Sequence, residues 1–460
     1  MQMNNKIVMP VMLDKRHKVC SGQNNAENTK RAVSSTCALN GKSNGKKKKK
    51  GRKYKLRKHY VSMTSIFQLE SEDTNLNSLK RTDSDRSMCT KLPVLHTRSP
   101  TPLSLPPSRL ANPLPQHLIP GAHERRKKLP ILSAIKPENE KSERERFMRA
   151  NYNYNPLFLY RFPADLDILE RLGKPSDKYM TQAILIMENA IDNYGTYEKF
   201  EEETGGKILG RSQIMAIIQQ YLKRENLERE IGVNLSEEIL SRGSMTRVRG
   251  KAMLNVRIIN LRENWVEGLL RHEIGTHYLR TCNNKEYPWN NWKIRKDMGL
   301  MNFNPTEEGL ASLHSVLFRK DPCLWRAALL YYTAYKAAFL SFKELFRDLG
   351  RFVSDPNVRW DYCIRAKRGQ KDTSLSGAFC KDQVYLEGAL QILKHRRVLD
   401  FHLLVRLGKI AFEDINMLKD YTDIKNTRIP SFMEDLNTYH KLLDRIAEAN
   451  GLTDDVLREV

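Results

Sequence analysis

The sequence lacks paired cysteines, an apolar leader and any uninterrupted apolar run long enough to cross a bilayer. Its seven cysteines are scattered and odd in number, and none forms a C-x-x-C pair. This spacing argues against a disulfide framework and a cysteine-based zinc ribbon, and it favours a reducing, cytoplasmic compartment. The most apolar run, residues 324–340, is interrupted by Arg326 and Lys336. We therefore predict a buried helix there, with no membrane span and no signal peptide.

Positive charge is concentrated in the first third of the chain. The net charge is +24; residues 1–150 contain 32 Lys and Arg against 12 Asp and Glu, and residues 151–460 contain 46 against 42. Residues 1–140 are rich in Asn, Ser, Lys and Pro and poor in periodic apolar positions. We predict that they form a disordered basic tail and that residues 141–460 form the folded domain.

A lysine run at residues 45–58, G-K-K-K-K-K-G-R-K-Y-K-L-R-K, is the most basic part of this tail. It is compatible with a solvated linker, a nuclear-import signal, or contact with nucleic acid or an acidic polymer. Nucleic acid is disfavoured because the run lacks an interleaved set of aromatic residues.

From about residue 160 the sequence predicts mainly helices. Residues 178–191 and 212–223 have apolar positions three and four apart, which is typical of amphipathic helices. Residues 246–258 alternate instead, with Arg247, Arg249 and Lys251 on one face and apolar residues on the other. We predict an α+β fold, mainly helical, with a small sheet that contains this strand.

The stretch R-H-E-I-G-T-H-Y-L-R, residues 271–280, places two histidines around a glutamate. The surrounding residues predict a helix that begins with a cap at Asn260 and ends near residues 283–284. Residues five apart differ by about 140° around an ideal helix, so His272 and His277 would point apart. A π-type bulge would return both to one face, and Gly275 lowers the cost of such a backbone.

Two plainer interpretations remain for the same residues. The histidines could simply complement the negative end of the helix dipole. Alternatively, Glu273 and His277 could form a surface ion pair between residues four apart.

A second segment strengthens the metal interpretation. Residues 301–318 predict a helix with Thr306 as its cap and Glu307 and Glu308 in its first turn. Both acids could merely complement the helix dipole. Alternatively, one of them completes a site of two histidines and one glutamate, which leaves the fourth zinc position open for water, as catalytic zinc requires.

Together, H-E-I-G-T-H, N-P-T-E-E-G-L-A and the preceding G-K-A-M-L-N-V-R resemble the microtubule-associated tyrosine carboxypeptidases over about residues 150–460. These are zinc metallopeptidases with H-E-x-x-x-H spacing, and we expect this chain to match the second of two vertebrate paralogues. The resemblance implies a zincin-like metallopeptidase domain with one Zn²⁺ per chain. Its ligands would be His272, His277 and Glu308, and its catalytic residue Glu273.

The resemblance also implies that the chain removes the C-terminal tyrosine of α-tubulin. The expected partners are then the acidic α-tubulin tail and microtubules, the expected location is the cytoskeleton, and the protein is expected to be a monomer. The basic tail fits microtubule attachment, because a flexible cationic segment raises the local substrate concentration on an acidic polymer. The alternative is a catalytically silent microtubule-binding protein, which the intact set of four site residues disfavours.

The sequence also contains candidate substrate-binding residues. Arg247, Arg249 and Lys251 could meet the acidic peptide or its terminal carboxylate, or they could form a solvated strand face. Tyr385 could hydrogen-bond the substrate or the oxyanion, or it could be a core tyrosine whose hydroxyl is satisfied.

Overall fold

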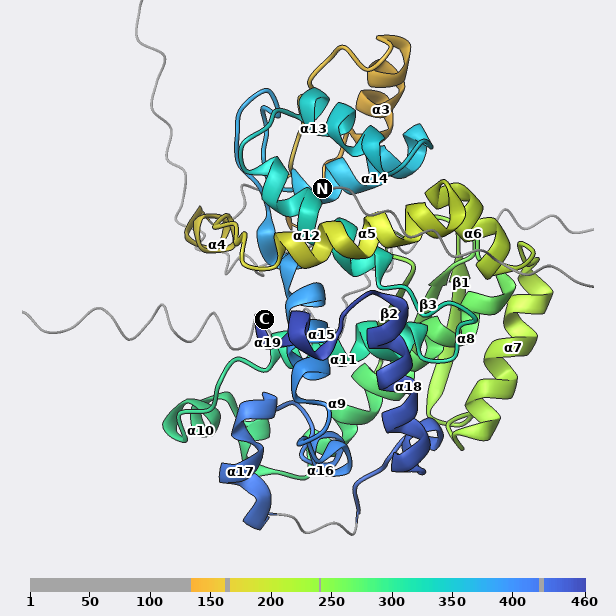
Figure 1. The fold of residues 1–460 in the computed structure, drawn as a ribbon, viewed down its shortest axis with the longest axis vertical. Helices are drawn as coiled ribbons and strands as arrows, with labels where there is room; N and C mark the ends of the chain where they lie inside the picture. Colours follow the sequence, from red (N-terminus) through yellow and green to blue (C-terminus); the bar gives the residue numbers. More distant parts are fainter. Residues whose placement is uncertain (1–133, 162–165, 240, 422–425) are drawn as a thin grey trace, which may run out of the picture. The chain divides into compact units, whose positions relative to one another are not determined.

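The computed structural model describes residues 134–161, 166–239, 241–421 and 426–460, so the predicted basic tail lies, up to residue 133, outside the described residues. Helices dominate the described part, as the periodicity predicts (Figure 1). The α-helices are α3 Glu140–Arg149, α4 Leu166–Leu172, α5 Met180–Tyr194, α6 Tyr197–Gly205, α7 Arg211–Arg224, α8 Glu263–Leu270, α9 Leu279–Asn284, α10 Trp292–Asp297, α11 Asn304–Val316, α12 Trp325–Ala337, α13 Phe342–Asp348, α14 Pro356–Ala366, α15 Val384–His395, α16 Phe401–Arg406, α17 Ile415–Leu418, α18 Leu436–Ala449 and α19 Asp454–Arg458.

Shorter helical elements join them. A π-helix, η1 Arg271–Tyr278, connects α8 to α9 without a break. The 3-10 turns are η2 Pro288–Asn290, η3 Leu349–Arg351, η4 Cys380–Gln383, η5 Phe412–Asp414, η6 Lys419–Tyr421 and η8 Ser431–Met433.

A small mixed sheet accompanies the helices. Its strands are β1 Ile231–Ser236, β2 Gly243–Val248 and β3 Lys251–Arg257. Their order is β1-β3-β2, with β1 parallel and β2 antiparallel to the central β3. The strand β2 is therefore an edge of this sheet, and the strands lie beside α7 and α8 (Figure 1).

The single strand predicted over residues 246–258 is wrong, because the chain reverses within it. β2 ends at Val248 and β3 begins at Lys251. Between them, Arg249 has a φ of 52° and Gly250 a φ of 81°. Positive φ at both central residues gives a tight two-residue hairpin, for which the glycine in R-G-K was the available signal. The predicted buried face is confirmed in β3 for Ala252, Leu254 and Val256.

Two apolar clusters form the core of the described residues. The larger gathers side chains from many helices, including α5, α11, α12 and α15. The smaller lies among the sheet, α7, α8 and η1. The apolar run at 324–340 forms α12, whose residues are mostly buried, as predicted. None of the described helices is long and apolar enough to cross a membrane.

Two predicted helix caps are wrong. The helix α8 follows Arg262, whereas Asn260 has a left-handed φ of 53°. The helix α11 follows Phe303, and Thr306 lies inside its first turn. The Thr306 hydroxyl accepts a hydrogen bond from the backbone N–H of Phe412 at 3.1 Å, so a distant segment uses the group that the local pattern assigned to capping.

Glycines hold α11 close to two other helices. A Cβ on Gly268 of α8 would lie 2.0 Å from the carbonyl oxygen of Ser315 in α11. A Cβ on Gly388 of α15 would lie 1.7 Å from the carbonyl oxygen of Pro305. Because no side chain fits at either contact, α11 packs at backbone distance against the helix that leads into η1 and against α15.

Candidate metal centre

The residues of the H-E-x-x-x-H motif lie in the π-helix η1, Arg271–Tyr278. A π-helix bonds each residue to the fifth one along, so residues five apart share a face. The imidazole ring centroids of His272 and His277 are accordingly 4.9 Å apart. The over-wide helix predicted from the motif spacing is confirmed.

A polar chain fixes the widened turn. The Thr276 hydroxyl donates to the carbonyl oxygen of Arg271, five residues earlier, at 2.9 Å. The same hydroxyl lies 2.7 Å from Nδ1 of His314, whose Nε2 lies 2.8 Å from the Tyr439 hydroxyl. Thr276, His314 and Tyr439 were not among the predicted site residues, and all three are buried.

Gly275 serves packing in addition to backbone freedom. A Cβ at this position would lie 2.6 Å from the ring of Phe432 and 3.0 Å from the hydroxyl oxygen of Tyr221. The sequence suggested only that glycine eases an irregular backbone. The structure gives it a second reason, because two aromatic side chains close over the widened turn.

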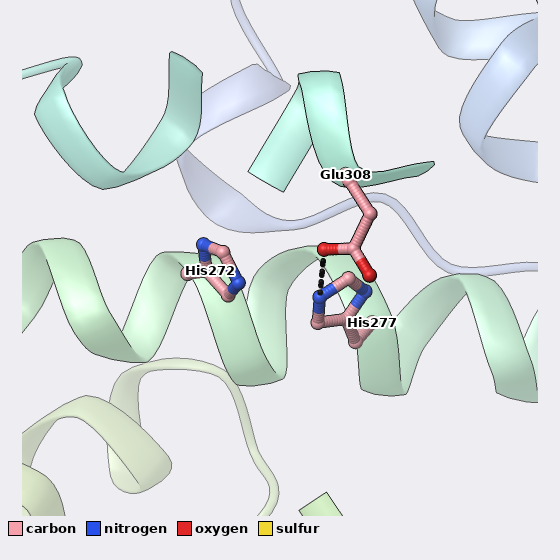
Figure 2. Close-up of side chains that lie close together, drawn as sticks. All are labelled: His272, His277 and Glu308. Carbon is pink, nitrogen blue, oxygen red and sulfur yellow. Dashed lines mark ion pairs between the residues drawn. The ribbon is translucent and has the colours of Figure 1, made fainter. Parts of the chain in front are cut away.

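Glu308 approaches the two histidines from α11 (Figure 2). Ligand atoms of His272, His277 and Glu308 all lie within 4.8 Å of one another. Oε2 of Glu308 is 3.5 Å from Nε2 of His277 and has no hydrogen-bond partner although it is buried. Nδ1–H of His272 donates to the carbonyl oxygen of Ala311 at 3.0 Å, which leaves Nε2 available. Two imidazole nitrogens and a carboxylate oxygen with these properties fit a metal ion.

Electrostatics at the three residues are strongly perturbed. Burial, together with the charge of His277, lowers the pKa of His272 to about 3, so this ring is neutral. Burial also disfavours charge on His277, but Glu308 and Glu307 outweigh it and raise the pKa of His277 to about 9. Burial opposes ionisation of Glu308, but the neighbouring His277 lowers the pKa of its carboxyl. The site therefore stabilises positive charge between two carboxylates, which is the place that a cation would take.

Glu273 projects from the same helix toward the edge strand β2. A Cβ on Gly243 of β2 would lie 3.1 Å from Cγ of Glu273 and 3.3 Å from its Oε1. A backbone hydrogen bond from Met245, also in β2, favours the ionised carboxylate, but burial dominates and raises the pKa of Glu273 to about 7. Glu273 is thus next to the triad in sequence but lies outside the cluster of ligand atoms.

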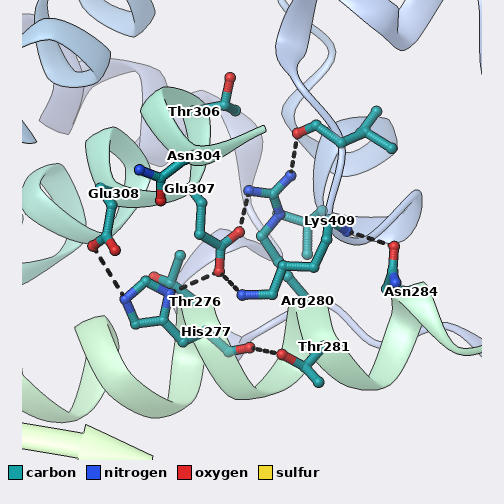
Figure 3. A network of polar contacts seen from close by, with 12 residues as sticks. Thr276, His277, Arg280, Thr281, Asn284, Asn304, Thr306, Glu307, Glu308 and Lys409 are labelled. Carbon is teal, nitrogen blue, oxygen red and sulfur yellow. Dashed lines mark hydrogen bonds and ion pairs between the residues drawn. The ribbon is translucent and has the colours of Figure 1, made fainter. Parts of the chain in front are cut away.

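Three further charged residues lie on the Nδ1 side of His277, linked to it through Glu307 (Figure 3). Nδ1–H of His277 donates to Oε1 of Glu307 at 2.7 Å. Glu307 also binds Arg280 and Lys409. The sequence had left Glu307 as a dipole partner or an alternative ligand, and it gave no signal for Lys409, which follows Glu307 by 102 residues.

Within the described residues, no hydrogen bond or ion pair joins the predicted basic face to the triad. Arg247, Arg249 and Lys251 are exposed at the turn of the β2–β3 hairpin. Glu273 contacts β2 at Gly243 and Met245. At about 3.3 Å per strand residue, Arg249 lies roughly 13 Å further along the chain than Met245.

Tyr385 lies much closer to the triad. It occupies the first turn of α15, three residues before Gly388 and hence on the face that packs against α11. The guanidinium of Arg365 lies over its ring at 5.8 Å. Burial raises the pKa of Tyr385, and the charge of Glu308 raises it further. The ring is half-buried and packs against the larger apolar cluster.

Relatives give the site its context. A family model described as "Microtubule-associated tyrosine carboxypeptidase" matches residues 167–451. The chain is 53% identical over 334 residues to "Putative tyrosine carboxypeptidase MATCAP2" of Mus musculus, covering 73% of this chain and 64% of the relative. It is 49% identical over 322 residues to "Microtubule-associated tyrosine carboxypeptidase 1" of Mus musculus, covering 70% of this chain and 69% of the relative.

The human "Putative tyrosine carboxypeptidase MATCAP2" is 47% identical over 334 residues, covering 73% of this chain and 55% of the relative. The chain therefore spans about 64% of the length of the mouse MATCAP2 relative and 55% of the length of the human one. The higher identity to the second mouse paralogue than to the first supports the predicted placement beside the second paralogue. The chain belongs to the microtubule-associated tyrosine carboxypeptidase family.

Proposed function

We propose that this chain is a zinc-dependent carboxypeptidase that removes the C-terminal tyrosine of α-tubulin on microtubules. The observation that carries the proposal is the convergence of His272, His277 and Glu308 within 4.8 Å, with Glu273 beside them. The names of its relatives supply the reaction and the microtubule association, which we extend to this chain.

Zinc suits the proposed ligand set. Catalytic zinc is commonly held by three protein ligands, including two histidines and a glutamate, with one position left for water. When bound, zinc would acidify a water molecule and polarise the scissile carbonyl. The orphaned Oε2 of Glu308 and the free Nε2 of His272 are the atoms that this ion would satisfy.

Glu273 would serve as the general base. Its carboxylate would take a proton from the attacking water and later deliver it to the leaving amine of the tyrosine, so that the C–N bond breaks as the proton arrives. Because Glu273 sits against β2, the water would be activated at the edge of the sheet. An extended peptide paired with β2 would then present its last bond to Glu273 in a zincin-like arrangement.

Arg326 is our candidate for the residue that receives the terminal carboxylate. Its side chain is exposed although burial by the surrounding protein lowers its pKa, so the guanidinium reaches water from a recessed position. Its charge adds to the lowering of the pKa of His272 by burial and opposes the rise in the pKa of Tyr385, so it lies near the triad. Within the described residues, no hydrogen bond or ion pair engages the side chain of Arg326.

Neighbouring cations are already engaged. Arg242 lies 3.7 Å from Glu201, and Arg365 binds Asp382. Arg326 also stands in the first turn of α12, which contains no acid, so the helix dipole opposes its charge. A cation at this place is unfavourable in the protein alone, and a bound anion would stabilise it. Arg326 therefore fits a role in binding an anionic ligand. The hairpin residues Arg247, Arg249 and Lys251 would then meet acidic residues further from the peptide's end.

A peptide ending in Glu-Glu-Tyr tests the proposal. Wild type should release tyrosine, detected by mass spectrometry, whereas Glu273→Gln should be inactive and still bind about one zinc per chain. Glu263→Gln, which changes an exposed acid of α8, is the matched control and should retain the wild-type rate. Equal cleavage by Glu273→Gln and wild type would contradict the mechanism, and an inactive wild type containing zinc would favour the silent microtubule-binding alternative.

A further inference from the structure

Glu307 is the centre of a buried charge cluster that contacts His277. Its carboxylate is fully buried and accepts hydrogen bonds from three side chains (Figure 3). Nδ1–H of His277 and the Lys409 ammonium both donate to Oε1. A guanidinium N–H of Arg280 donates to Oε2 at 2.7 Å.

The division of donors between the two oxygens matters. Arg280 holds only Oε2, so on its own it would let the carboxylate turn about that contact. Lys409 and His277 share Oε1, so Lys409 fixes the oxygen that receives the imidazole N–H. A carboxylate that accepts from Nδ1–H leaves the Nε2 lone pair of His277 directed toward Glu308 and the proposed ion.

Lys409 is itself firmly placed. Its backbone N–H donates to Oδ1 of Asn284 at 3.1 Å, and its carbonyl oxygen accepts from Arg295. The preceding Gly408 has a φ of 78°, and a Cβ there would lie 2.4 Å from the backbone nitrogen of Asn284. Only glycine therefore allows the loop to reach the end of α9 and insert its lysine behind His277.

The loop that carries Gly408 and Lys409 also contacts Arg280. A guanidinium N–H of Arg280 donates to the carbonyl oxygen of Ile410 at 3.0 Å. Arg280, Lys409 and Glu307 are 0%, 4% and 0% exposed, so water cannot replace any of these contacts. Removing a carboxylate and two cations from water carries a large desolvation penalty. The cluster therefore stabilises the fold less than its number of contacts suggests.

From this geometry we infer that Lys409 is a positioning residue for the metal site, acting through Glu307 on His277, with Arg280 as its counterpart on the other carboxylate oxygen. The inference rests on the proposed function and names residues that tune it. His272 differs, because its Nδ1–H donates to a backbone carbonyl and to no charged group. The two histidines would thus be oriented by different means, and only His277 would depend on a distant side chain.

Zinc affinity measured by competition with a fluorescent chelator tests the inference. Lys409→Met keeps the aliphatic stem but removes the ammonium, and it should weaken zinc binding about 10- to 100-fold, as loss of an outer partner of a metal ligand typically does. Lys409→Arg should restore most of the affinity. Glu307→Asp retains the charge but withdraws the carboxylate by one methylene, and it should also weaken binding.

Lys367→Met is the matched control. Lys367 is likewise fully buried, but its ammonium donates to the carbonyl oxygens of Ala337, Leu375 and Gly377, and none of these residues contacts the triad. This variant should lower the melting temperature and leave zinc affinity unchanged. The visible spectrum of the Co²⁺-substituted protein gives a second readout, which should change for Lys409→Met and stay constant for Lys367→Met.

The possible results separate the two hypotheses. A wild-type protein that binds no zinc would remove the proposed function itself. Wild-type zinc affinity in both Lys409→Met and Glu307→Asp would overturn the positioning role while leaving the proposed function intact. Equal loss of zinc affinity in Lys409→Met and Lys367→Met would also overturn it, because the effect would then follow from general destabilisation.

Discussion

Gly309 of α11 and Gly388 of α15 meet backbone to backbone: a Cβ on Gly309 would lie 2.2 Å from the carbonyl carbon of Gly388. Glu308 is the residue immediately before Gly309. The distance between α11 and α15 at this contact therefore determines the distance between Glu308 and the two histidines. The position of the third candidate ligand thus depends on a helix–helix contact that admits no side chain.

Gly388→Ala should therefore damage stability and zinc binding together. The new methyl group would overlap the carbonyl oxygen of Pro305, 1.7 Å away, and push α11 aside. We expect a loss of about 1–3 kcal/mol or more in the free energy of unfolding, measured in urea, with weaker zinc binding. Gly350→Ala is the control. A Cβ at Gly350 would lie 3.1 Å from the end of the flexible Arg359 side chain, which can move aside. If Gly388→Ala binds zinc as wild type does, the helix contact does not set the ligand position.

Metal removal should destabilise the folded protein through the same three residues. Adding zinc to chelated wild type at 100 times its Kd should raise the free energy of unfolding by about 2.7 kcal/mol and raise Tm accordingly. Glu308→Gln and His277→Ala should respond little. His395→Ala serves as the control, because His395 bonds to the Gln391 carbonyl within α15 and should leave the response intact. An equal response in Glu308→Gln would exclude Glu308 as a ligand.

Arg326 should discriminate a free terminal carboxylate from an amide. In an inactive Glu273→Gln background, a tail peptide with a free carboxylate should bind more tightly than its amide. Arg326→Gln should weaken binding of the acid about 10- to 100-fold and remove this difference, because hydrogen bonds to charged groups contribute about 1.5–3 kcal/mol. Binding is measured by fluorescence anisotropy.

The control for this prediction is Arg247→Gln. Arg247 is exposed on β2, next to the hairpin turn. This variant should weaken acid and amide peptides alike. If instead Arg247→Gln removes the preference for the acid and Arg326→Gln keeps it, the carboxylate is held at the hairpin.

Thr276→Val should loosen the π-helix while preserving side-chain volume. It removes the hydroxyl that bonds the Arg271 carbonyl and faces His314, and loss of a buried hydrogen-bond partner costs about 1–3 kcal/mol. Thr333→Val is matched to it, because the Thr333 hydroxyl is also buried and bonds the Leu329 carbonyl four residues earlier, in the ordinary helix α12. Both variants should unfold at lower urea concentration, but only Thr276→Val should lose zinc affinity.

The candidate triad could be predicted from the sequence because helical geometry restricts which residues can share a face. Histidines five residues apart can share a face only if the helix widens, and the structure contains that π-helix at the predicted place. The segment carrying Glu307 and Glu308 was found for a similar reason, since paired acids opening an apolar helix are conspicuous. Choosing between the two acids required the family resemblance, because their local patterns are equivalent.

What the sequence could not give depends on contacts between distant segments. Lys409 enters the site through a loop fixed to the end of α9, and nothing in its neighbourhood distinguishes it from other lysines. The caps at Asn260 and Thr306 failed because tertiary contacts and a left-handed residue overrode local preference. The hairpin was missed because alternation continues on both sides of a two-residue turn, so Arg249 and Gly250 were read as part of one strand.

The widened turn also bears on how the histidine spacing can change between related proteins. Deleting one residue between Ile274 and Thr276 would restore the commoner four-residue spacing of the histidines in an ordinary helix. Residues four apart in an α-helix share a face, as residues five apart do in the π-helix, so the chain after the deletion would keep nearly its present angle about the helix axis. Arg280 would still face Glu307, and the Asn283 side-chain amide would still face the Val405 and Arg428 carbonyl oxygens. The extra residue is therefore absorbed where it occurs, and one insertion or deletion at this turn would exchange the two histidine spacings without dismantling the far end of the site.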